Sequence, residues 1–370
     1  MTKCHIAYLA CTAALVGAGL GATPAAAAHH HLLLVRPGES IQKAVDAAQP
    51  GDTVLIAPGT YYESVKITTP QLTLRGTGLG MTVIKPDPKV VPKPAATTSS
   101  NADTTQDTAT CAEGGNGICV VGTKTRDIEG VTVSDLTVTG FSRTGVFGMA
   151  TDGMTVRRVY AVKNGVWGIA QERSVRGVFK YNYARDNGDA GLFLANTVKA
   201  EQGATDTKGT LVQRNRLEGN RIGLTVRRLR NLTVAGNYVT GNCAGVFIVG
   251  DENKPKAGDM LVTDNRVAAN NKSCPKTERL PQLQGSGIVL TGAEKTTVTG
   301  NVITDHAGKS PLSGGIVLFK SFVGVTSEQN RIESNTLDNN SPADLVNTDT
   351  GRNNTFTGNR CRASKPSGMC

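Results

Sequence analysis

The chain has 370 residues, with 43 glycines and only 4% aromatic residues, and its formal net charge at pH 7 is +10. This composition argues against a helical bundle and fits thin strands joined by tight turns. The basic charge suits an anionic partner such as an acidic polysaccharide or cell-surface polymer, and the lack of a nucleic-acid-binding motif argues against nucleic acid.

The N-terminal 28 residues have the pattern of a secretory signal peptide. Lys3 precedes an apolar run from Ile6 to Leu20, and small residues follow as far as Ala28. The run is too short for a stable membrane span, so we expect cleavage after Ala28 and a secreted protein, extracellular or in the cell envelope. Residues 29–370 are then the mature domain, which we expect to be monomeric.

Six cysteines remain in the mature chain, and an even number in an exported protein favours disulfides. Fifteen pairings are possible. Neighbourhood along the chain favours three of them: Cys111 with Cys119, Cys243 with Cys274, and Cys361 with Cys370.

The mature chain begins with a short helix followed by strands. Ile41, Ala44, Val45 and Ala48 have helical spacing after the capping residue Ser40, and 50–52 (Pro-Gly-Asp) end the helix. Strands are predicted at 53–57, 65–67 and 72–74. A helix in this place is expected to cover the open end of a stack of strands.

Residues 210–250 contain a repeat of 22 residues. Asn215 and Gly223 recur as Asn237 and Gly245, and the apolar residues alternate as they do in strands. A unit of this length cannot bury its own apolar side, so it must stack on copies of itself. The pattern predicts a β-solenoid in which the asparagines occupy sharp turns and bond to one another in a ladder.

The stretch SIQKAVDAAQPGDTVLIAPGTYYESVKI, followed by LTLRGTGLGMTVI, resembles the opening of exported right-handed parallel β-helix proteins of the pectate-lyase-like superfamily. The later repeats are similar too, so the likeness covers roughly residues 35 to 360. The resemblance implies an all-β fold, a single right-handed parallel β-helix of nine or ten coils with a short N-terminal capping helix. It does not fix an activity, because the superfamily holds lyases, epimerases, hydrolases, esterases and non-catalytic accessory proteins.

The ladder position is assigned to Asp135, Arg158, Asn182, Asn215, Asn237, Asn265, Asn301, Asn335 and Asn359. Residues in excess of 22 per coil must leave as loops. These are 198–209 and 251–259 after the glycine-led strand, and 85–116, 271–286 and 306–314 before it. The segment 85–116 is predicted to be a long flexible loop. The glycine-led strands then form the floor of a groove, which resembles the superfamily's substrate cleft.

Alternation places five aromatic side chains on the outer side of this floor or beside it, where they could bind sugar rings. They are Phe147, Trp167, Phe193, Phe247 and Phe319. The alternative is that a loop or the C-terminal tail covers them, because large exposed apolar surfaces are uncommon in soluble monomers.

Three charged residues near the floor are candidates for catalysis. A polysaccharide lyase or epimerase needs a base, for which Glu172 is the candidate, and a cation to stabilise the enolate-like charge, for which Arg227 and Lys320 are candidates. Hydrolysis is less favoured because Glu172 has no facing carboxylate. We therefore expect a lyase or epimerase acting on an acidic polysaccharide, with a non-catalytic glycan-binding or surface-binding protein as the alternative; the sequence leaves open whether the protein is an enzyme.

The sequence assigns no metal site and no cofactor. Residues 186–189 (Asp-Asn-Gly-Asp) are rich in oxygen but are interpreted as a turn, and so is His306. Cleavage after Ala28 would expose the histidines 29–31, a set of nitrogen ligands suited to Cu(II). Since some superfamily members resemble accessory proteins for the maturation of copper enzymes, this role is a third hypothesis.

Overall fold

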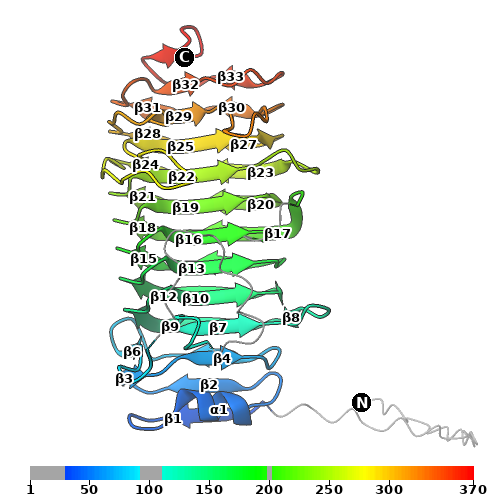
Figure 1. Ribbon diagram of the computed structural model, residues 1–370, viewed down its shortest axis with the longest axis vertical. Helices are drawn as coiled ribbons and strands as arrows, with labels where there is room; N and C mark the ends of the chain where they lie inside the picture. The colour runs from blue at the N-terminus through cyan, green and yellow to red at the C-terminus, as the bar shows by residue number, and fades with distance from the viewer. Residues whose placement is uncertain (1–29, 92–110, 198–201) are drawn as a thin grey trace, which may run out of the picture.

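The computed structural model describes residues 30–91, 111–197 and 202–370. The predicted signal peptide, His29 and most of the predicted 85–116 loop lie outside these residues. The described chain winds into a column of parallel strands stacked one above another, with the N-terminal end at one end of the column and the C-terminus at the other (Figure 1).

One wall of the column, here called sheet 1, is an 11-stranded sheet that contains the glycine-led strands. Its strands pair in parallel along the column (Figure 1). In chain order they are β4 (Val65–Ile67), β7 (Ile118–Val121), β10 (Thr144–Met149), β13 (Trp167–Glu172), β16 (Ala190–Ala195), β19 (Ile222–Arg227), β22 (Ala244–Val249), β25 (Ser286–Thr291), β29 (Gly314–Leu318), β32 (Leu345–Asn347) and β34 (Ser364–Lys365). Eleven strands correspond to slightly more coils than the nine or ten expected.

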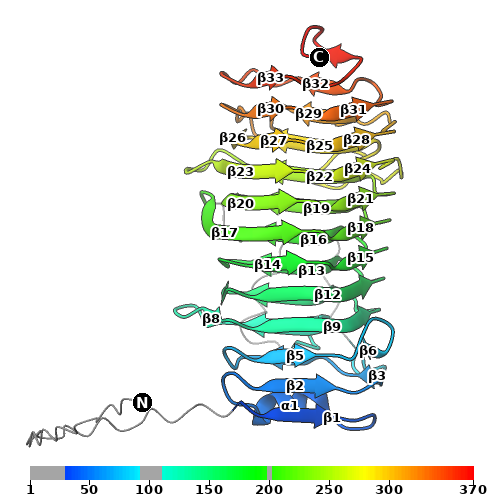
Figure 2. The same ribbon diagram turned by 180° about the vertical axis from the view of Figure 1, so that it is seen from behind.

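The remaining walls form one 21-stranded sheet that bends at a corner. Sheet 2 is the part before the corner: β1 (Leu32–Val35), β2 (Thr53–Ile56), β5 (Thr73–Arg75), β14 (Val178–Lys180), β17 (Thr205–Gln213), β20 (Leu229–Ala235), β23 (Ala257–Thr263), β26 (Ala293–Glu294), β27 (Thr297–Thr299), β30 (Arg331–Glu333) and β33 (Thr355–Thr357). Sheet 3 is the part after it: β3 (Gly59–Tyr62), β6 (Thr82–Lys85), β15 (Tyr183–Arg185), β18 (Arg216–Glu218), β21 (Tyr238–Thr240), β24 (Arg266–Ala268), β28 (Val302–Thr304) and β31 (Thr336–Asp338). The long strands β9 (Thr132–Thr139) and β12 (Thr155–Val162) run through the corner, and β8 (Ile128–Glu129) pairs with β11 (Thr151–Asp152) in a separate small sheet. Figure 2 shows these walls from behind.

The hydrophobic core fills the inside of the column. Val146, Ile169, Leu192, Leu224 and Val246 occupy matching positions of successive sheet 1 strands, and all five are fully buried in one continuous core. Because side chains of a strand alternate between its two faces, the residues that follow each of them must point outward. The strand-like alternation of apolar residues predicted from the repeat is therefore confirmed.

The predicted asparagine ladder is present. The side-chain nitrogen of Asn215 donates to the side-chain oxygen of Asn237 at 2.9 Å, and Asn182, Asn265, Asn301, Asn335 and Asn359 continue the series. The assignment of Asp135 and Arg158 to this ladder is wrong. The ladder position in these coils is held by Leu136 and Val159, which pair with each other, and Val159 donates its N–H to Asn182. Asp135 and Arg158 each lie one residue before that position and adopt left-handed backbone conformations (φ 60° and 50°).

The recurring glycine of sheet 1 has a steric cause. A Cβ atom at Gly223 would lie 2.4 Å from a Val239 methyl group and 2.7 Å from the carbonyl oxygen of Gly245 in the next coil. No side chain fits between coils at this point, so glycine is required.

The predicted capping helix, α1 (Ile41–Ala47), closes the N-terminal end of the column. Ile41 and Val45 are buried against the first coils, and Ser40 caps the helix by accepting the N–H of Lys43. The carboxylate of Glu63 accepts the N–H of Ile41 at 2.7 Å. Within the described ranges, no helix is long and apolar enough to cross a membrane.

The disulfides are those predicted: Cys111–Cys119, Cys243–Cys274 and Cys361–Cys370. The predicted loop 198–209 is too long, because β17 begins at Thr205 and its first residues pair with β20 before a shift in register. The described ends of the 85–116 segment, 86–91 and 111–116, contain no strand.

Candidate functional site

The outer face of sheet 1 carries two apolar clusters that are separate from the core. The first contains Phe147, Trp167, Ala170, Ala190, Phe193 and Ala195. The second contains Ile222, Cys243, Ala244, Phe247, Cys274, Leu283, Val289, Leu312, Val317, Ala343 and Val346. Phe147, Ala170 and Phe193 pair across successive strands. The outward orientation inferred from alternation is therefore correct.

Most of the predicted sugar-binding rings are not open to solvent. Phe147, Trp167, Phe193 and Phe247 are 2–7% exposed, so the expectation of available ring faces is not met at these four positions. Trp167 and Phe193 stack on each other, with 4.1 Å between ring centroids and 6° between planes. Each ring uses a face to pack on its neighbour, which removes that face from any ligand.

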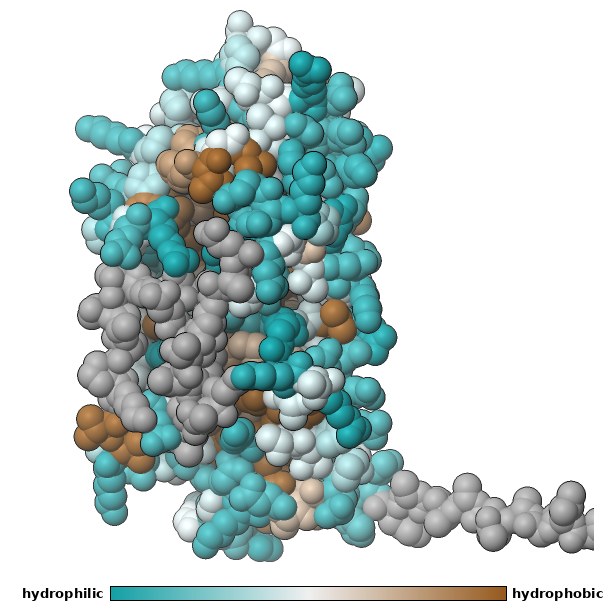
Figure 3. Space-filling model, turned by 45° about the vertical axis from the view of Figure 1, so that its right-hand side comes forward, coloured by the Kyte–Doolittle hydropathy of each residue, from teal (hydrophilic) through white to brown (hydrophobic). Residues whose placement is uncertain are grey.

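Phe319 differs from the other four rings because it is only partly buried. It follows β29 and packs against Phe322 at 5.1 Å, and the side chain of Phe322 is 57% exposed. Figure 3 shows a mainly hydrophilic surface on which hydrophobic side chains gather in a few separate places.

The C-terminal half of the outer face is covered by the segment 271–285, here called the lid. Leu283 of the lid is fully buried in the second cluster with Phe247 and Val289. Cys274 and Leu283 form an antiparallel bridge that shapes the lid, and the Cys243–Cys274 disulfide ties it to the edge of β22. This half of the predicted groove is therefore closed by a fixed element.

Charged side chains gather on the N-terminal half of the outer face, beside the first cluster. Arg143, Asp189 and Arg221 lie just before β10, β16 and β19, and the backbone N–H of Arg221 donates to the carbonyl of Asp189 at 2.9 Å. The indole N–H of Trp167 donates to the Asp189 carboxylate at 3.1 Å, and the Arg221 guanidinium lies 3.9 Å from the same carboxylate. One carboxyl group is thus held between an aromatic ring and a cation.

The surroundings shift the proton affinities of these groups. Burial raises the pKa of Asp189, although the hydrogen bond from Trp167 and the charge of Arg221 oppose the shift. Burial lowers the pKa of Arg221 and also that of Arg143, where the charge of Glu172 opposes it. A carboxyl group with a raised pKa can exchange protons closer to neutral pH, which general acid or base catalysis requires.

The three predicted catalytic residues are only partly brought together. Glu172 lies at the end of β13 and is 4% exposed. Arg227 occupies the matching position two coils further on, and two strand spacings put the backbones of the two residues roughly 10 Å apart. Arg227 donates to the carbonyl of Thr197 at 3.3 Å. Lys320 is exposed and lies three coils beyond Arg227, roughly 14 Å away, so it does not share a site with Glu172.

Sequence reasoning did not identify Arg143, Asp189 or Arg221 as site residues. Asp189 was interpreted as a turn residue, and the turn is real, but its carboxylate points to Trp167. The available signal was the phase of the repeat, because Arg143, Val166, Asp189 and Arg221 all precede sheet 1 strands and connect through successive backbone hydrogen bonds. Comparison of the coils in register would have placed these charges in one column.

The two carboxylates of this face are too far apart for glycoside hydrolysis. Glu172 pairs with Ala195, and Asp189 lies six residues before Ala195 in the same coil. The Cα atoms of Asp189 and Glu172 are therefore roughly 20 Å apart. Hydrolases place their two carboxyl groups about 5–9.5 Å apart. The arrangement instead offers one proton-exchanging carboxyl group beside guanidinium groups that can bind a carboxylate.

No group of three or more His, Cys, Asp or Glu side chains that could hold a metal ion occurs among the described residues. His31 lies 3.4 Å from Asp52, and His30 packs against Gly51. His306 is buried in a second ladder, between Asn270 and Asn340, which agrees with its interpretation as a turn residue.

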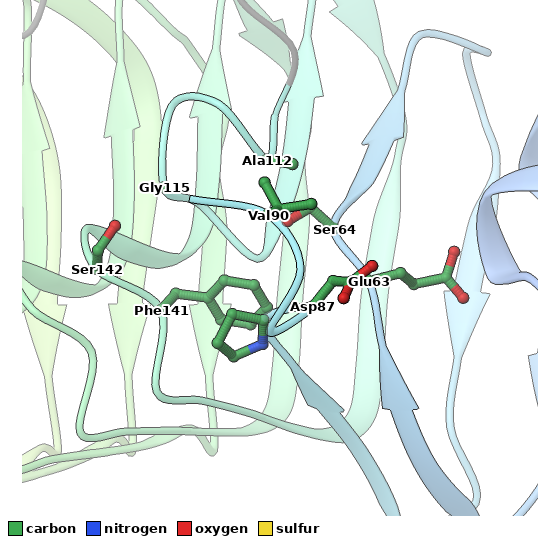
Figure 4. A pocket seen from close by; sticks show the side chains of 9 residues that line it. Glu63, Ser64, Asp87, Val90, Ala112, Gly115, Phe141 and Ser142 are labelled. Carbon is green, nitrogen blue, oxygen red and sulfur yellow. The ribbon is translucent and has the colours of Figure 1, made fainter. Parts of the chain in front are cut away.

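A small recess of about 130 Å³ lies near the N-terminal end, lined by Glu63, Ser64, Pro86, Asp87, Val90, Ala112, Gly115, Phe141 and Ser142. Figure 4 shows the Glu63 carboxylate pointing away from Phe141. That carboxylate binds the start of α1, and the Ser64 hydroxyl donates to the carbonyl of Asn116 at 2.8 Å. Both groups support the fold, so we assign no ligand to this recess.

Two family models match the sequence. One, described as a right handed beta helix region, matches residues 97–259, and together with the stacked parallel strands it settles the architecture. The chain is a right-handed parallel β-helix protein. The second model, described as periplasmic copper-binding protein (NosD), matches residues 196–365 of this β-helix protein. None of the curated proteins matches the sequence of this β-helix protein.

Solved structures with the same architecture include a Geobacillus virus E2 protein, ORF18, with 15% identity and a TM-score of 0.59. The match covers 86% of the β-helix protein and 56% of the viral chain. The A-module of the Azotobacter vinelandii mannuronan C-5 epimerase AlgE4 has 19% identity and a TM-score of 0.53, with 89% and 95% of the two chains covered. An alginate lyase from Paenibacillus sp. str. FPU-7 has 13% identity and a TM-score of 0.52, with 87% and 99% covered. At these identities the likeness shows the fold alone.

Proposed function

We propose that this β-helix protein is an exported carbohydrate-active protein of lyase or epimerase type that acts on an acidic polysaccharide, and that the N-terminal half of the outer face of sheet 1 is its site. The observation that carries the proposal is the Asp189 carboxyl group, held between Trp167 and Arg221 with a raised pKa. The mannuronan epimerase and alginate lyase among the structural neighbours support this choice of reaction.

The two reactions share their first step. A base removes the proton on the carbon next to the uronate carboxylate, and the negative charge moves onto that carboxylate. Asp189 is suited to accept the proton, and Arg221 to stabilise the charge. In a lyase reaction the proton taken up by Asp189 passes to the departing glycosidic oxygen and a carbon–carbon double bond is left, whereas in epimerisation a proton from solvent adds to the opposite face and Asp189 releases its own proton to solvent. Glu172 and Arg227, at the other ends of the strands and roughly 20 Å from Asp189, would contact more distant units of the same polymer.

The test is incubation of the mature protein with polygalacturonate, alginate and hyaluronan. New double bonds are followed by ultraviolet absorbance, and epimerisation by NMR of the products. We expect turnover of at least one polymer, lost in Asp189→Asn and in Arg221→Gln. Asp338→Asn is the control, because Asp338 lies near the C-terminal end of the column, outside the proposed site, where it pairs with Arg362 at 3.2 Å. Binding without any turnover would overturn the catalytic proposal and favour a non-catalytic glycan-binding protein.

Export is part of the same proposal. Three disulfides favour an oxidising compartment, and the second family model describes a periplasmic protein. N-terminal sequencing of protein recovered outside the cytoplasm should begin at residue 29. A chain that keeps Met1 and stays in the cytoplasm would contradict the predicted signal peptide.

The match to the copper-binding family model favours one second candidate, an accessory role in copper-enzyme maturation. Among the described residues, no group of three or more His, Cys, Asp or Glu side chains could hold copper. The candidate copper ligands are therefore the histidines 29–31 at the expected mature terminus. Titration of the mature protein with Cu(II), with a variant in which all three histidines are replaced by glutamine as control, tests this role. If the two proteins bind copper equally weakly, the candidate fails.

A further inference from the structure

The outer surface of sheet 3 gathers tyrosine and arginine side chains far from the site on sheet 1. Four of the chain's seven tyrosines lie here, together with exposed arginines. This surface, called the tyrosine–arginine face, consists of Tyr160, Tyr181, Tyr183, Arg214, Arg216, Tyr238 and Arg266. The strands that carry it, from β12 through β15, β18 and β21 to β24, follow one another along the column (Figure 2).

Contacts with aromatic rings hold the central arginine in place. Tyr160 and Tyr183 stack with 4.8 Å between centroids and 13° between planes. The Arg216 guanidinium lies 5.0 Å from the ring of Tyr183 and 5.6 Å from that of Tyr238, so it is placed between the two rings. Glu218 also pairs with Arg216 at 2.7 Å, but the side chain of Arg216 remains 52% exposed. A fixed cation loses less conformational entropy on binding a ligand than a mobile one.

Arg214 is held by a neutral group. Its Nη1 atom donates to the Tyr181 hydroxyl at 2.8 Å, and its guanidinium lies 5.8 Å from the centre of that ring. Across residues 30–91, 111–197 and 202–370, no carboxylate lies within ion-pair distance of Arg214. A phenol positions a guanidinium without neutralising it, so the charge of Arg214 remains available to an anion.

The surrounding charges make this side of the column basic. In segments 158–163, 181–186, 214–219, 236–241 and 264–269, which form the corner and sheet 3 in five successive coils, six side chains are cationic and three are carboxylates. The cations are Arg158, Lys163, Arg185, Arg214, Arg216 and Arg266, and the carboxylates are Asp186, Glu218 and Asp264; Asp135 of the preceding coil also accepts a hydrogen bond from Arg158 at 2.9 Å. The excess of positive charge over this surface attracts a polyanion and would repel a basic partner.

The cations also repeat along the column. Arg216 and Arg266 occupy the same position two coils apart, with Tyr238 between them, and Arg158 and Arg214 are likewise separated by Tyr181. Two strand spacings amount to about 9.6 Å. An extended polyuronate presents equivalent carboxylates once per disaccharide, a repeat of the same order. Near one end of the face, a shallow hollow of about 380 Å³ is lined by Tyr160, Lys163 and Arg185, among others.

We propose that the tyrosine–arginine face is a second polysaccharide-binding surface, which holds an extended uronate polymer along the axis of the column. Carboxylates of alternate sugars contact the arginines, and the tyrosine hydroxyls and ring edges contact the sugars between them. The surface does not include the site on sheet 1, so either can fail without the other.

The test compares two double variants with equal changes in charge. Arg214→Gln with Arg266→Gln alters the face, whereas Arg126→Gln with Arg352→Gln alters two exposed arginines elsewhere. Binding of oligogalacturonate and oligomannuronate is measured by calorimetry at low and raised salt, with dextran as a neutral control. We expect the first variant to bind about tenfold or more weakly, the second to stay within about twofold of the unchanged protein, and binding of the unchanged protein to weaken with salt.

Equal binding by the two double variants would overturn the proposal, and so would a face variant that loses binding to anionic lipid vesicles but keeps binding to oligouronates. Asp189→Asn separates the two sites. If it abolishes turnover while calorimetric binding persists and depends on Arg214 and Arg266, both proposals stand. If no polymer is turned over but binding still depends on these arginines, only the catalytic proposal fails.

Discussion

The two halves of the outer face of sheet 1 use the same backbone positions for different purposes. From β10 to β19 the outward aromatic side chains pack beside Arg143, Glu172, Asp189 and Arg221. From β22 to β29 they pack under the lid, and Leu283 and Leu312 complete an apolar cluster that includes one disulfide. Outward-facing phenylalanines therefore do not by themselves identify a ligand surface on this fold.

The difference comes from the loops rather than from the strands. Phe193 and Phe247 have the same strand position and similar burial. Their surroundings differ because the lid follows the coil of β22 and supplies Cys274 and Leu283. Burial with charged neighbours fits a site that works on a polar ligand, and burial under an apolar lid fits stabilisation.

The largest expected effect is on stability, from Phe247→Ala. Removal of a ring that contacts both strands and lid should lower the free energy of unfolding by about 3–5 kcal/mol, because the cavity is closed on all sides. Phe193→Ala should cost less, since water can enter beside Asp189 and Arg143. Denaturant unfolding of the two variants checks this order. Equal losses would mean that the halves do not differ in packing.

Removal of the Cys243–Cys274 disulfide, by replacing both cysteines with serine, should cost about 2–4 kcal/mol. The lid would then be held only by contacts such as the hydrogen bond of 2.8 Å from Arg221 to the carbonyl of Pro275. We expect increased binding of a hydrophobic dye and faster proteolysis within 271–285. The double serine variant of Cys361 and Cys370, at the C-terminal end, is the control and should leave the lid protected.

Acid should weaken the C-terminal half through His306. Burial lowers the pKa of His306 to about 4 from a usual 6.5, so the folded state holds the neutral ring. In the tautomer that satisfies both neighbours, Nδ1 donates to Asn340 and Nε2 accepts from Asn270. The contribution of His306 to the free energy of unfolding is fully present above pH 6.5 and is lost as the pH falls towards 4.

At pH 5 the loss should be about 2 kcal/mol relative to pH 7.5. His306→Asn restores the residue found at the other ladder positions and should remove this part of the pH dependence. Unfolding of both proteins across pH 7.5 to 5 is the measurement. Parallel curves for the variant and the unchanged protein would contradict the assignment.

The smallest expected effect on stability is that of Asp189→Asn in the charged half. A raised carboxyl pKa means that ionisation is disfavoured in the folded state, so stability falls as the pH rises through the folded pKa. The amide removes this cost and keeps an acceptor for Trp167. Because the side chain is 38% exposed, we expect a gain below about 1 kcal/mol at pH 7. A large loss would show that Asp189 serves packing rather than chemistry.

The fold was predictable because its determinants are local and repeated. The spacing of Asn215 and Asn237, the capping of α1 by Ser40 and the alternation around Val246 each follow from contacts between neighbouring coils. The site was less predictable because it depends on which loop covers which strand and on how far long side chains reach across coils. The position of Glu172 on the outer face follows from alternation, whereas Asp189 was not singled out because it lies in a turn outside the alternating pattern.

Residues 215–227 and 237–249 of two consecutive coils pair at a constant offset of 22 residues, and the inserted loop 251–259 comes only after them. A copy of residues 215–236 placed in tandem would therefore meet, above and below, the same donors, acceptors and glycine carbonyls that its template meets. The protein is thus expected to tolerate lengthening by whole turns at this point, and a polymer bound along its axis would gain one more subsite with each added turn.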